Sequence, residues 1–227
     1  SGRKNSVDAI NKDDAAPKLL RAFAANPTTI TLLFDESLDS LSASSLTNYT
    51  LDNGLSAINV NPIPPLFNKI NITVNNPLTT GTVYGITVKN VSDCLGNNIG
   101  SQHSAKFGLA QDADSLDVVI NEILFNPLPL GADYVELYNR SAKIIDLSKI
   151  YIANRNSGNM ISSIQQLTTE NILLFPGDYI ALTTDPGAVK SQYITTNRDA
   201  FLKLETMPSF SNDKGSVIIL SGQGNII

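Results

Sequence analysis

The stretch Leu116–Phe125 reads LDVVINEILF, and the stretch Asp133–Asn139 reads DYVELYN. Both are rich in aliphatic, β-branched and aromatic residues, and the second alternates from one residue to the next. Successive side chains of a strand point to opposite faces, so its two tyrosines share a face with Glu136, whereas Val135 and Leu137 share the other. We expect Val135 and Leu137 to face a hydrophobic core, and we predict a β-strand in each stretch.

Further strand signals follow toward the C-terminus. They are Ile144-Ile145, Ile150-Tyr-Ile152, Tyr179-Ile-Ala-Leu182 and Val217-Ile-Ile-Leu220. The connections between them contain Asn-Pro and Pro-Gly pairs, in which proline fixes φ for a turn and glycine tolerates positive φ. Residues 117–227 are therefore predicted to form an all-β unit.

The first half of the chain has the same kind of pattern, from Ala16 to about Phe107, and no long stretch has a helical period. The clearest runs are Thr29-Ile-Thr-Leu-Leu-Phe34, Ile70-Asn-Ile-Thr-Val74 and Val83-Tyr-Gly-Ile-Thr-Val88. Several short strands in roughly 100 residues favour a Greek-key sandwich. We predict an all-β protein with two Ig-like, Greek-key β-sandwich domains in tandem. The predicted parts are a polar tail at 1–13, a first domain at 14–110, a linker at 111–116 and a second domain at 117–227.

Composition and charge exclude several classes of function. The 227 residues contain 16 Lys+Arg and 21 Asp+Glu, which gives a net charge of −5. Nucleic-acid binding is disfavoured, because it depends on clustered positive charge. The single histidine and single cysteine exclude a zinc cage of Cys and His ligands. We expect His103 at an exposed strand edge and Cys94 as a small core residue beside a turn.

Residues 117–227 resemble a lamin tail domain of the kind found in bacterial secreted and surface proteins. The resemblance rests on VINEILFNP at 119–127, GADYVELYNRS at 131–141, IDLS at 145–148, LFPGDY at 174–179 and FSNDKGS at 210–216. Tyr134 stands where the family usually has tryptophan. The family normally closes with a further strand after the Gly-Asn turn. We expect Ile226-Ile227 to begin that strand, the domain to be truncated at its C-terminus, and a sheet edge to be left unpaired.

Residues 14–110 resemble the bacterial Ig-like modules that precede such domains in Bacteroidetes-type multidomain proteins. The supporting segments are DAAP at 14–17, TITLLFDE at 29–36, NYT at 48–50, LTTG at 78–81, Tyr84, and VSDCLGN at 91–97. This resemblance implies the fold and an exported context, and it implies no activity.

The candidate binding residues are polar and aromatic members of the two strands quoted first. They are Glu122, Asp133, Tyr134, Glu136 and Tyr138. In a regular strand Glu122 would share its face with Ile120 and Leu124, where a carboxylate needs a partner. One hypothesis is a recognition surface with a charged centre, and another is an acidic cluster that binds a hard cation such as Ca²⁺. The structural alternative is that the carboxylates accept hydrogen bonds that hold neighbouring strands or loops together.

A hydrolytic acid/base pair is a further interpretation of the same carboxylates. The sequence contains no nucleophile elbow, phosphate loop or metal-hydrolase motif that would support it. We therefore predict no enzymatic activity, no cofactor and no metal.

We expect a non-enzymatic structural and interaction module of a larger exported protein, located outside the cell, at its surface or in the periplasm. The lamin-tail-like domain would bind a protein, a glycan or a cell-envelope component, and the Ig-like domain would be a spacer. We expect a monomer without a membrane span and without a nucleic-acid partner. The predicted binding loops are Pro127–Asp133, Arg155–Gln166 and Thr183–Thr196. The alternative is that both domains are accessory to a secreted nuclease or phosphatase whose catalytic domain lies outside this segment.

Overall fold

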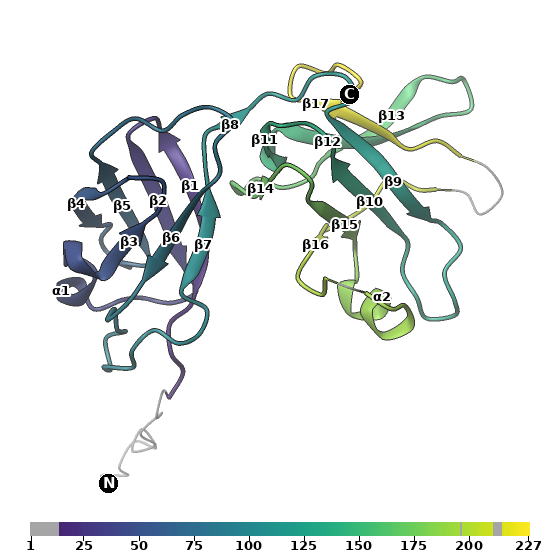
Figure 1. Cartoon of the computed structure of the whole chain (residues 1–227). Coiled ribbons are helices and arrows are strands. Elements are labelled where there is room, and N and C mark those ends of the chain that lie inside the picture. The colour runs from purple at the N-terminus through teal and green to yellow at the C-terminus, as the bar shows by residue number, and fades with distance from the viewer. Residues whose placement is uncertain (1–13, 196, 211–214) are drawn as a thin grey trace, which may run out of the picture. The chain divides into compact units, whose positions relative to one another are not determined.

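The computed structural model describes residues 14–195, 197–210 and 215–227, which form two compact units. The first unit consists of the described residues up to Pro77 together with Tyr84–Phe107, and the second consists of Leu78–Val83 together with Gly108–Ile227. Both are built from mainly antiparallel sheets with little helix (Figure 1). The predicted fold class, two β-sandwiches in tandem, is confirmed. The predicted polar tail at 1–13 lies outside the described residues.

The first unit contains a four-stranded and a three-stranded sheet. The four-stranded sheet has the order β1 (Leu19–Asn26), β2 (Thr29–Phe34), β5 (Lys69–Val74) and β4 (Ala57–Pro62). The three-stranded sheet has the order β3 (Tyr49–Leu51), β6 (Tyr84–Val88) and β7 (Ser104–Phe107). This division of seven strands is that of a constant-type immunoglobulin sandwich. A helical turn, α1 (Ser40–Ala43), and a 3₁₀ turn (Leu46–Asn48) connect β2 to β3.

Alternating burial explains why these segments form strands. In β5 and β6 every second side chain is buried, which leaves one face of each sheet for the core and the other for solvent. The Tyr84 and Phe107 rings stack in the core with their centroids 5.5 Å apart. The residues between buried positions, among them Gly85 and Thr87, therefore line the outward face of the three-stranded sheet.

Cys94 and His103 lie in the connection between β6 and β7. Cys94 is exposed, which corrects the expectation of a core position. The buried residue of this turn is its neighbour Asp93, whose carboxylate accepts hydrogen bonds from the loop. His103 is partly exposed, and its Nδ1 lies 2.9 Å from the carbonyl oxygen of Gly100.

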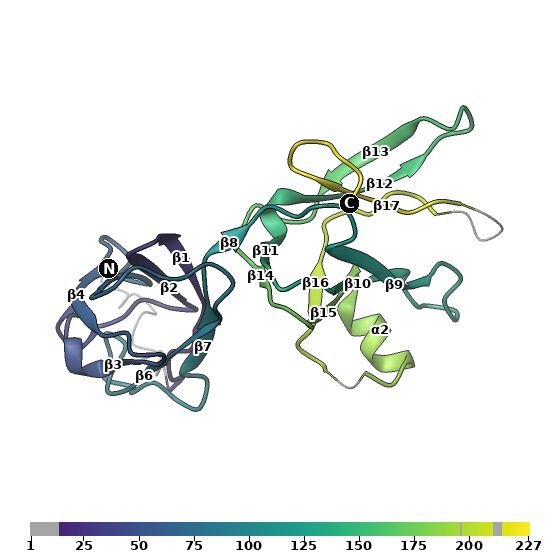
Figure 2. The ribbon, with the colours of Figure 1, turned by 45° about the horizontal axis from the view of Figure 1, so that its top comes forward.

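The second unit contains three sheets. The largest has the order β16 (Phe201–Lys203), β15 (Tyr179–Thr183), β10 (Tyr134–Asn139) and β9 (Val118–Leu124). The second has the order β13 (Ile161–Gln166), β12 (Ile150–Arg155) and β17 (Ile218–Ser221). The third has the order β14 (Leu173–Leu174), β11 (Ile144–Asp146) and β8 (Ala110–Gln111). A 3₁₀ turn spans Leu147–Lys149, and helix α2 (Pro186–Gln192) lies beside β15 and β16 (Figure 2).

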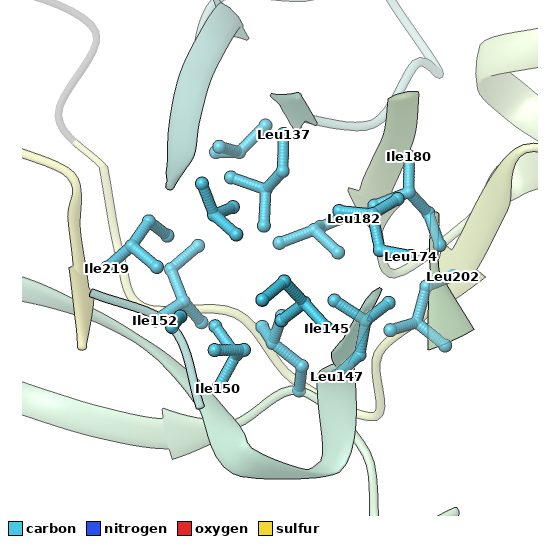
Figure 3. Close-up of a cluster of buried hydrophobic side chains, with 14 of the residues drawn as sticks. Leu137, Ile145, Leu147, Ile150, Ile152, Leu174, Ile180, Leu182, Leu202 and Ile219 are labelled. Atoms are coloured by element: carbon cyan, nitrogen blue, oxygen red, sulfur yellow. The ribbon is translucent and has the colours of Figure 1, made fainter. Parts of the chain in front are cut away.

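All three sheets contribute to one core. Val135 and Leu137 are completely buried, as their positions in the alternating strand predict. Figure 3 shows Leu137 from β10 and Leu182 from β15 close to Ile145 of β11 and to Ile152 and Ile219 of the second sheet. Burying aliphatic side chains of this size contributes roughly 1.5–3 kcal/mol each, so this cluster is what holds the sheets together.

The segment predicted as a linker belongs to the second unit. Ala110 and Gln111 form β8, which pairs in parallel with β11. Asp112 pairs with Lys149 at 2.9 Å, and Asp114 with Lys143 at 2.5 Å. Because the backbone and the acids of this segment find partners in the second unit, residues 111–116 belong to that unit's longer stretch, Gly108–Ile227.

The last described residues return toward β17. A turn over 222–225 brings Ile226 opposite Leu220, and the Ile227 N–H donates to the Ile219 carbonyl oxygen at 3.1 Å. Ile226, expected to begin a further strand, forms an isolated bridge with β17.

Candidate binding surface

The outward side of the sheet β16–β15–β10–β9, here called the outer face, carries most of the candidate residues. Residues directly opposite each other in an antiparallel pair share a face. Glu136 is opposite Glu122 of β9, and Tyr138 is opposite Tyr179 of β15. Tyr134 also lies on this face, because it alternates with the buried Val135 and Leu137.

Each carboxylate of the outer face accepts a hydrogen bond from a neutral side chain. The Tyr134 hydroxyl donates to Oε1 of Glu122 at 2.6 Å, and the Asn121 amide donates to Oε1 of Glu136 at 2.7 Å. Both bonds join β9 to β10, as the structural alternative for Glu122 supposes. Neither carboxylate forms an ion pair with a lysine or arginine in the part of the chain that the structure describes.

A β-bulge explains where Glu122 points. The register passes from Glu136 opposite Glu122 to Leu137 opposite Ile120, so Asn121 is an extra residue in β9. As a result Ile120 packs against the core while Glu122 is exposed. The expectation that Ile120 and Glu122 share a face is wrong, because strict alternation fails at a bulge.

Two pairs of tyrosines flank the carboxylates. The Tyr138 and Tyr179 rings stack with centroids 4.4 Å apart, and the Tyr134 and Tyr193 rings meet edge to face at 6.4 Å. Tyr179 is 45% exposed, so this stacked pair is open to solvent. Burial raises the pKa of Tyr134, and the hydrogen bond to Glu122 raises it further.

Tyr179 and Tyr193 were not among the predicted site residues. Their positions depend on which strand lies beside β10, and that pairing joins segments about 40 to 60 residues apart. The sequence contains one local indication. Neighbouring residues of a strand point to opposite faces, so Tyr179 points away from the core that buries Ile180.

Asp133 stands at the start of β10 and has a different role. Its backbone oxygen accepts a hydrogen bond from the Thr183 hydroxyl at 2.7 Å. Burial raises the pKa of its carboxyl group. Among residues 14–195, 197–210 and 215–227, no group of three or more His, Cys, Asp or Glu side chains could hold a metal ion. The structure thus offers no support for the acidic cluster proposed as a cation site.

The segments predicted to be binding loops are more structured than expected. Helix α2 occupies part of 183–195, and β13 occupies half of Arg155–Gln166, so both segments contain regular structure. The segment 127–133 contacts the end of α2, where the Leu128 N–H donates to the Tyr193 hydroxyl at 3.3 Å. The Gln192 amide also donates to the Pro129 oxygen at 3.0 Å. Thr196 lies outside the described residues.

Three solved structures resemble the chain distantly. The N-terminal part of the bacterial S-layer protein SbsC is 15% identical with a TM-score of 0.38, over 72% of this chain and 45% of that one. A longer structure of SbsC is 13% identical with a TM-score of 0.39, over 94% of this chain and 34% of that one. A DUF4876 family protein from Bacteroides thetaiotaomicron VPI-5482 is 14% identical with a TM-score of 0.29, over 78% and 64%. The chain thus spans less than two thirds of each of these structures.

The other comparisons concern sequence. No curated protein matches the chain significantly. Within the part of the chain that the structure describes, no helix is long and apolar enough to cross a membrane. The family model of the lamin tail domain matches residues 111–227, which include β9 and β10 with their outer face and the salt-bridged segment after β8. The chain belongs to the lamin tail domain family.

Proposed function

We propose that this chain is a non-enzymatic structural and interaction module of a larger exported or cell-surface protein. The lamin tail domain presents its outer face to a protein, a glycan or a cell-envelope component. The first unit, whose strand order is that of an immunoglobulin sandwich, acts as an Ig-like spacer. A sandwich suits this role because its sheets are rigid and one face of each can be given over to contact.

One observation carries the proposal: the open pair Tyr138–Tyr179 next to two carboxylates that have no ion-pair partner in the described residues. Tyrosine supplies a large, stiff contact area together with a hydroxyl, and it is enriched in interfaces. Glu122 and Glu136 each accept a hydrogen bond that fixes the side chain in place. This favours a preformed contact surface over a catalytic pair, whose acid and base must be free to exchange protons.

The binding proposal is tested with the envelope fraction of the source organism. We expect the wild-type chain to sediment with that fraction, and the variant with Tyr138→Ala and Tyr179→Ala to lose at least about tenfold in retention, because truncating aromatic anchors removes most of the contact energy. Ile164→Ala is the matched control, since Ile164 is a 58% exposed side chain on β13, in a different sheet of the same unit. Equal retention of the tyrosine double variant would refute the outer face as the contact.

The absence of catalysis is tested separately. The purified chain is incubated with a chromogenic phosphate ester and with duplex DNA, and we expect no turnover above buffer. Turnover that disappears in Glu122→Gln or Glu136→Gln would contradict the proposal and would make these two carboxylates an acid/base pair.

A further inference from the structure

The first unit has a hollow on its surface. The proposed function, a spacer and a binding outer face, assigns no role to the side chains that line it. It lies on the outward face of β3, β6 and β7 and has a volume of about 370 Å³, within the usual range of small-molecule sites. Its lining residues are Thr50, Leu51, Asp52, Gly85, Ile86, Thr87, Ser104, Ala105 and Lys106. All of them come from the first unit.

Three hydroxyl groups form one row of the hollow. Thr50 is opposite Thr87, and Thr87 is opposite Ser104, so the three side chains cross the sheet side by side. The Thr87 and Ser104 hydroxyl oxygens are 3.1 Å apart. A hydroxyl both donates and accepts, so this row can bond a ligand group of either kind.

The next row places opposite charges on either side of a glycine. Gly85, in the central strand β6, is opposite Lys106 of β7, and its N–H donates to Oδ1 of Asp52 at 2.8 Å. A Cβ at position 85 would lie 2.8 Å from Oδ2 of Asp52, so any larger residue there would displace this carboxylate. Glycine in the middle of a strand weakens the strand. Here Gly85 leaves open space beside the Asp52 carboxylate, which the Gly85 N–H holds in place.

The chemistry of the lining indicates the class of ligand. The charges of the Asp52 carboxylate and the Lys106 ammonium group cancel, so the hollow favours neither an anion nor a cation. Three hydroxyls, one strong acceptor and one strong donor complement a molecule whose own groups are mostly hydroxyls. The hollow is open to solvent, which allows such a unit to be part of a longer chain.

We propose that this hollow binds a neutral sugar unit of a glycan, so that the first unit is a carbohydrate-binding module as well as a spacer. Thr87 and Ser104 bond the ring hydroxyls, Asp52 accepts from them, and Lys106 donates to them. The proposal concerns the first unit only, and it stands or falls independently of the outer face of the lamin tail domain.

The test is an NMR titration of the ¹⁵N-labelled 227-residue chain. The probes are cellohexaose, chitohexaose and a mannohexaose, each up to about 10 mM. We expect at least one of them to shift the amide signals of Gly85, Thr87 and Ser104 saturably. No saturable shift at these amides with any probe, or shifts confined to other residues, would overturn the proposal.

Variants then assign the contacts. Thr87→Val and Ser104→Ala should each weaken binding by about 3- to 10-fold, the loss expected for one hydrogen bond. Thr50→Val is a third hydroxyl deletion, for use where either variant fails to give a native spectrum. Thr73→Val, on the outward face of β5 in the other sheet, is the matched control and should bind like wild type. Wild-type affinity in folded hydroxyl variants, or equal loss in the Thr73 control, would refute the site.

Discussion

Asn139 is completely buried at the end of β10, and each polar atom of its side chain has a partner. Its amide donates to the carbonyl oxygens of Lys143 and Leu174 at 2.8 and 2.9 Å. Its oxygen accepts from the N–H and the hydroxyl of Ser141 at 3.1 and 2.8 Å. This asparagine closes the DYVELYN stretch, and its contacts join β10 to the turn after it and to β14 (Leu173–Leu174).

Asn139→Ala should destabilise the second unit by about 3 kcal/mol, because two buried carbonyls and the Ser141 donors lose their partners. Asn139→Asp should cost at least as much, since it sets a carboxylate oxygen against two carbonyl oxygens. The measurement is urea unfolding followed by circular dichroism. Asn126→Ala is the control, because the Asn126 side chain is exposed. A loss below about 1 kcal/mol in Asn139→Ala would show that water replaces these bonds.

Asp93 has the corresponding role in the first unit. It is 3% exposed, and its carboxylate accepts from the backbone N–H groups of Leu95 and Asn97 at 2.8 Å and from the Asn97 amide at 2.7 Å. Burial raises its pKa, but these hydrogen bonds outweigh burial and hold the pKa below its ordinary value.

Asp93→Ala should therefore destabilise the first unit by about 2–3 kcal/mol. Asp93→Asn, which keeps one acceptor oxygen, should lose less. Both are measured by urea unfolding at pH 7. Equal and small effects in the two variants would mean that the loop does not depend on this carboxylate.

At the scale of elements, the charged segment after β8 makes the second unit sensitive to acid. Lys143, with 24% of its side chain exposed, pairs with Asp117 at 2.6 Å, and the Asp117 side chain is 17% exposed. Burial raises the pKa of Asp117, but hydrogen bonds from Lys143 and from the Asp114 N–H outweigh it, so the pKa is lowered. The hydrogen bond from Lys149 lowers the pKa of Asp112.

A carboxyl group whose pKa is lowered by folding stabilises the fold above its unfolded pKa, about 4, and loses this contribution as the pH falls through the folded value. The second unit should therefore lose stability below about pH 4. The raised pKa of Lys143 has the opposite sign, and its contribution is lost only as the pH rises above the ordinary lysine value. Lys143→Met should lower the free energy of unfolding by about 1 kcal/mol at pH 7. In a plot of the urea midpoint against pH, the decrease at acid pH should be smaller in this variant than in the wild type. An unchanged decrease at acid pH would contradict the assignment.

Local patterns predicted the elements well where burial alternates strictly. The alternation of β10 predicted the buried Val135 and Leu137 correctly, because side-chain direction in a strand depends only on position. The bulge at Asn121 could not be predicted in this way, since it depends on the register between β9 and β10. The same holds for Tyr179, whose place beside Tyr138 is decided by the pairing of β15 with β10. The linker was misjudged because polar residues can be free or paired, and here Lys143 and Lys149 pair with them.

At the scale of the whole molecule, each unit has buried hydrophobic side chains of its own, and this predicts two unfolding transitions. The buried cluster around Leu137 and Ile152 is contained in the second unit, and the Tyr84–Phe107 stack belongs to the first. A transition is cooperative within the residues that share a core, and substitutions without shared partners act additively. In calorimetry of the full chain, Asp93→Ala should shift only one transition and Asn139→Ala only the other. With roughly 100 residues in each unit, a loss of about 2 kcal/mol should lower the affected Tm by about 8–16 °C. Movement of both transitions in either single variant would show that the two units unfold as one.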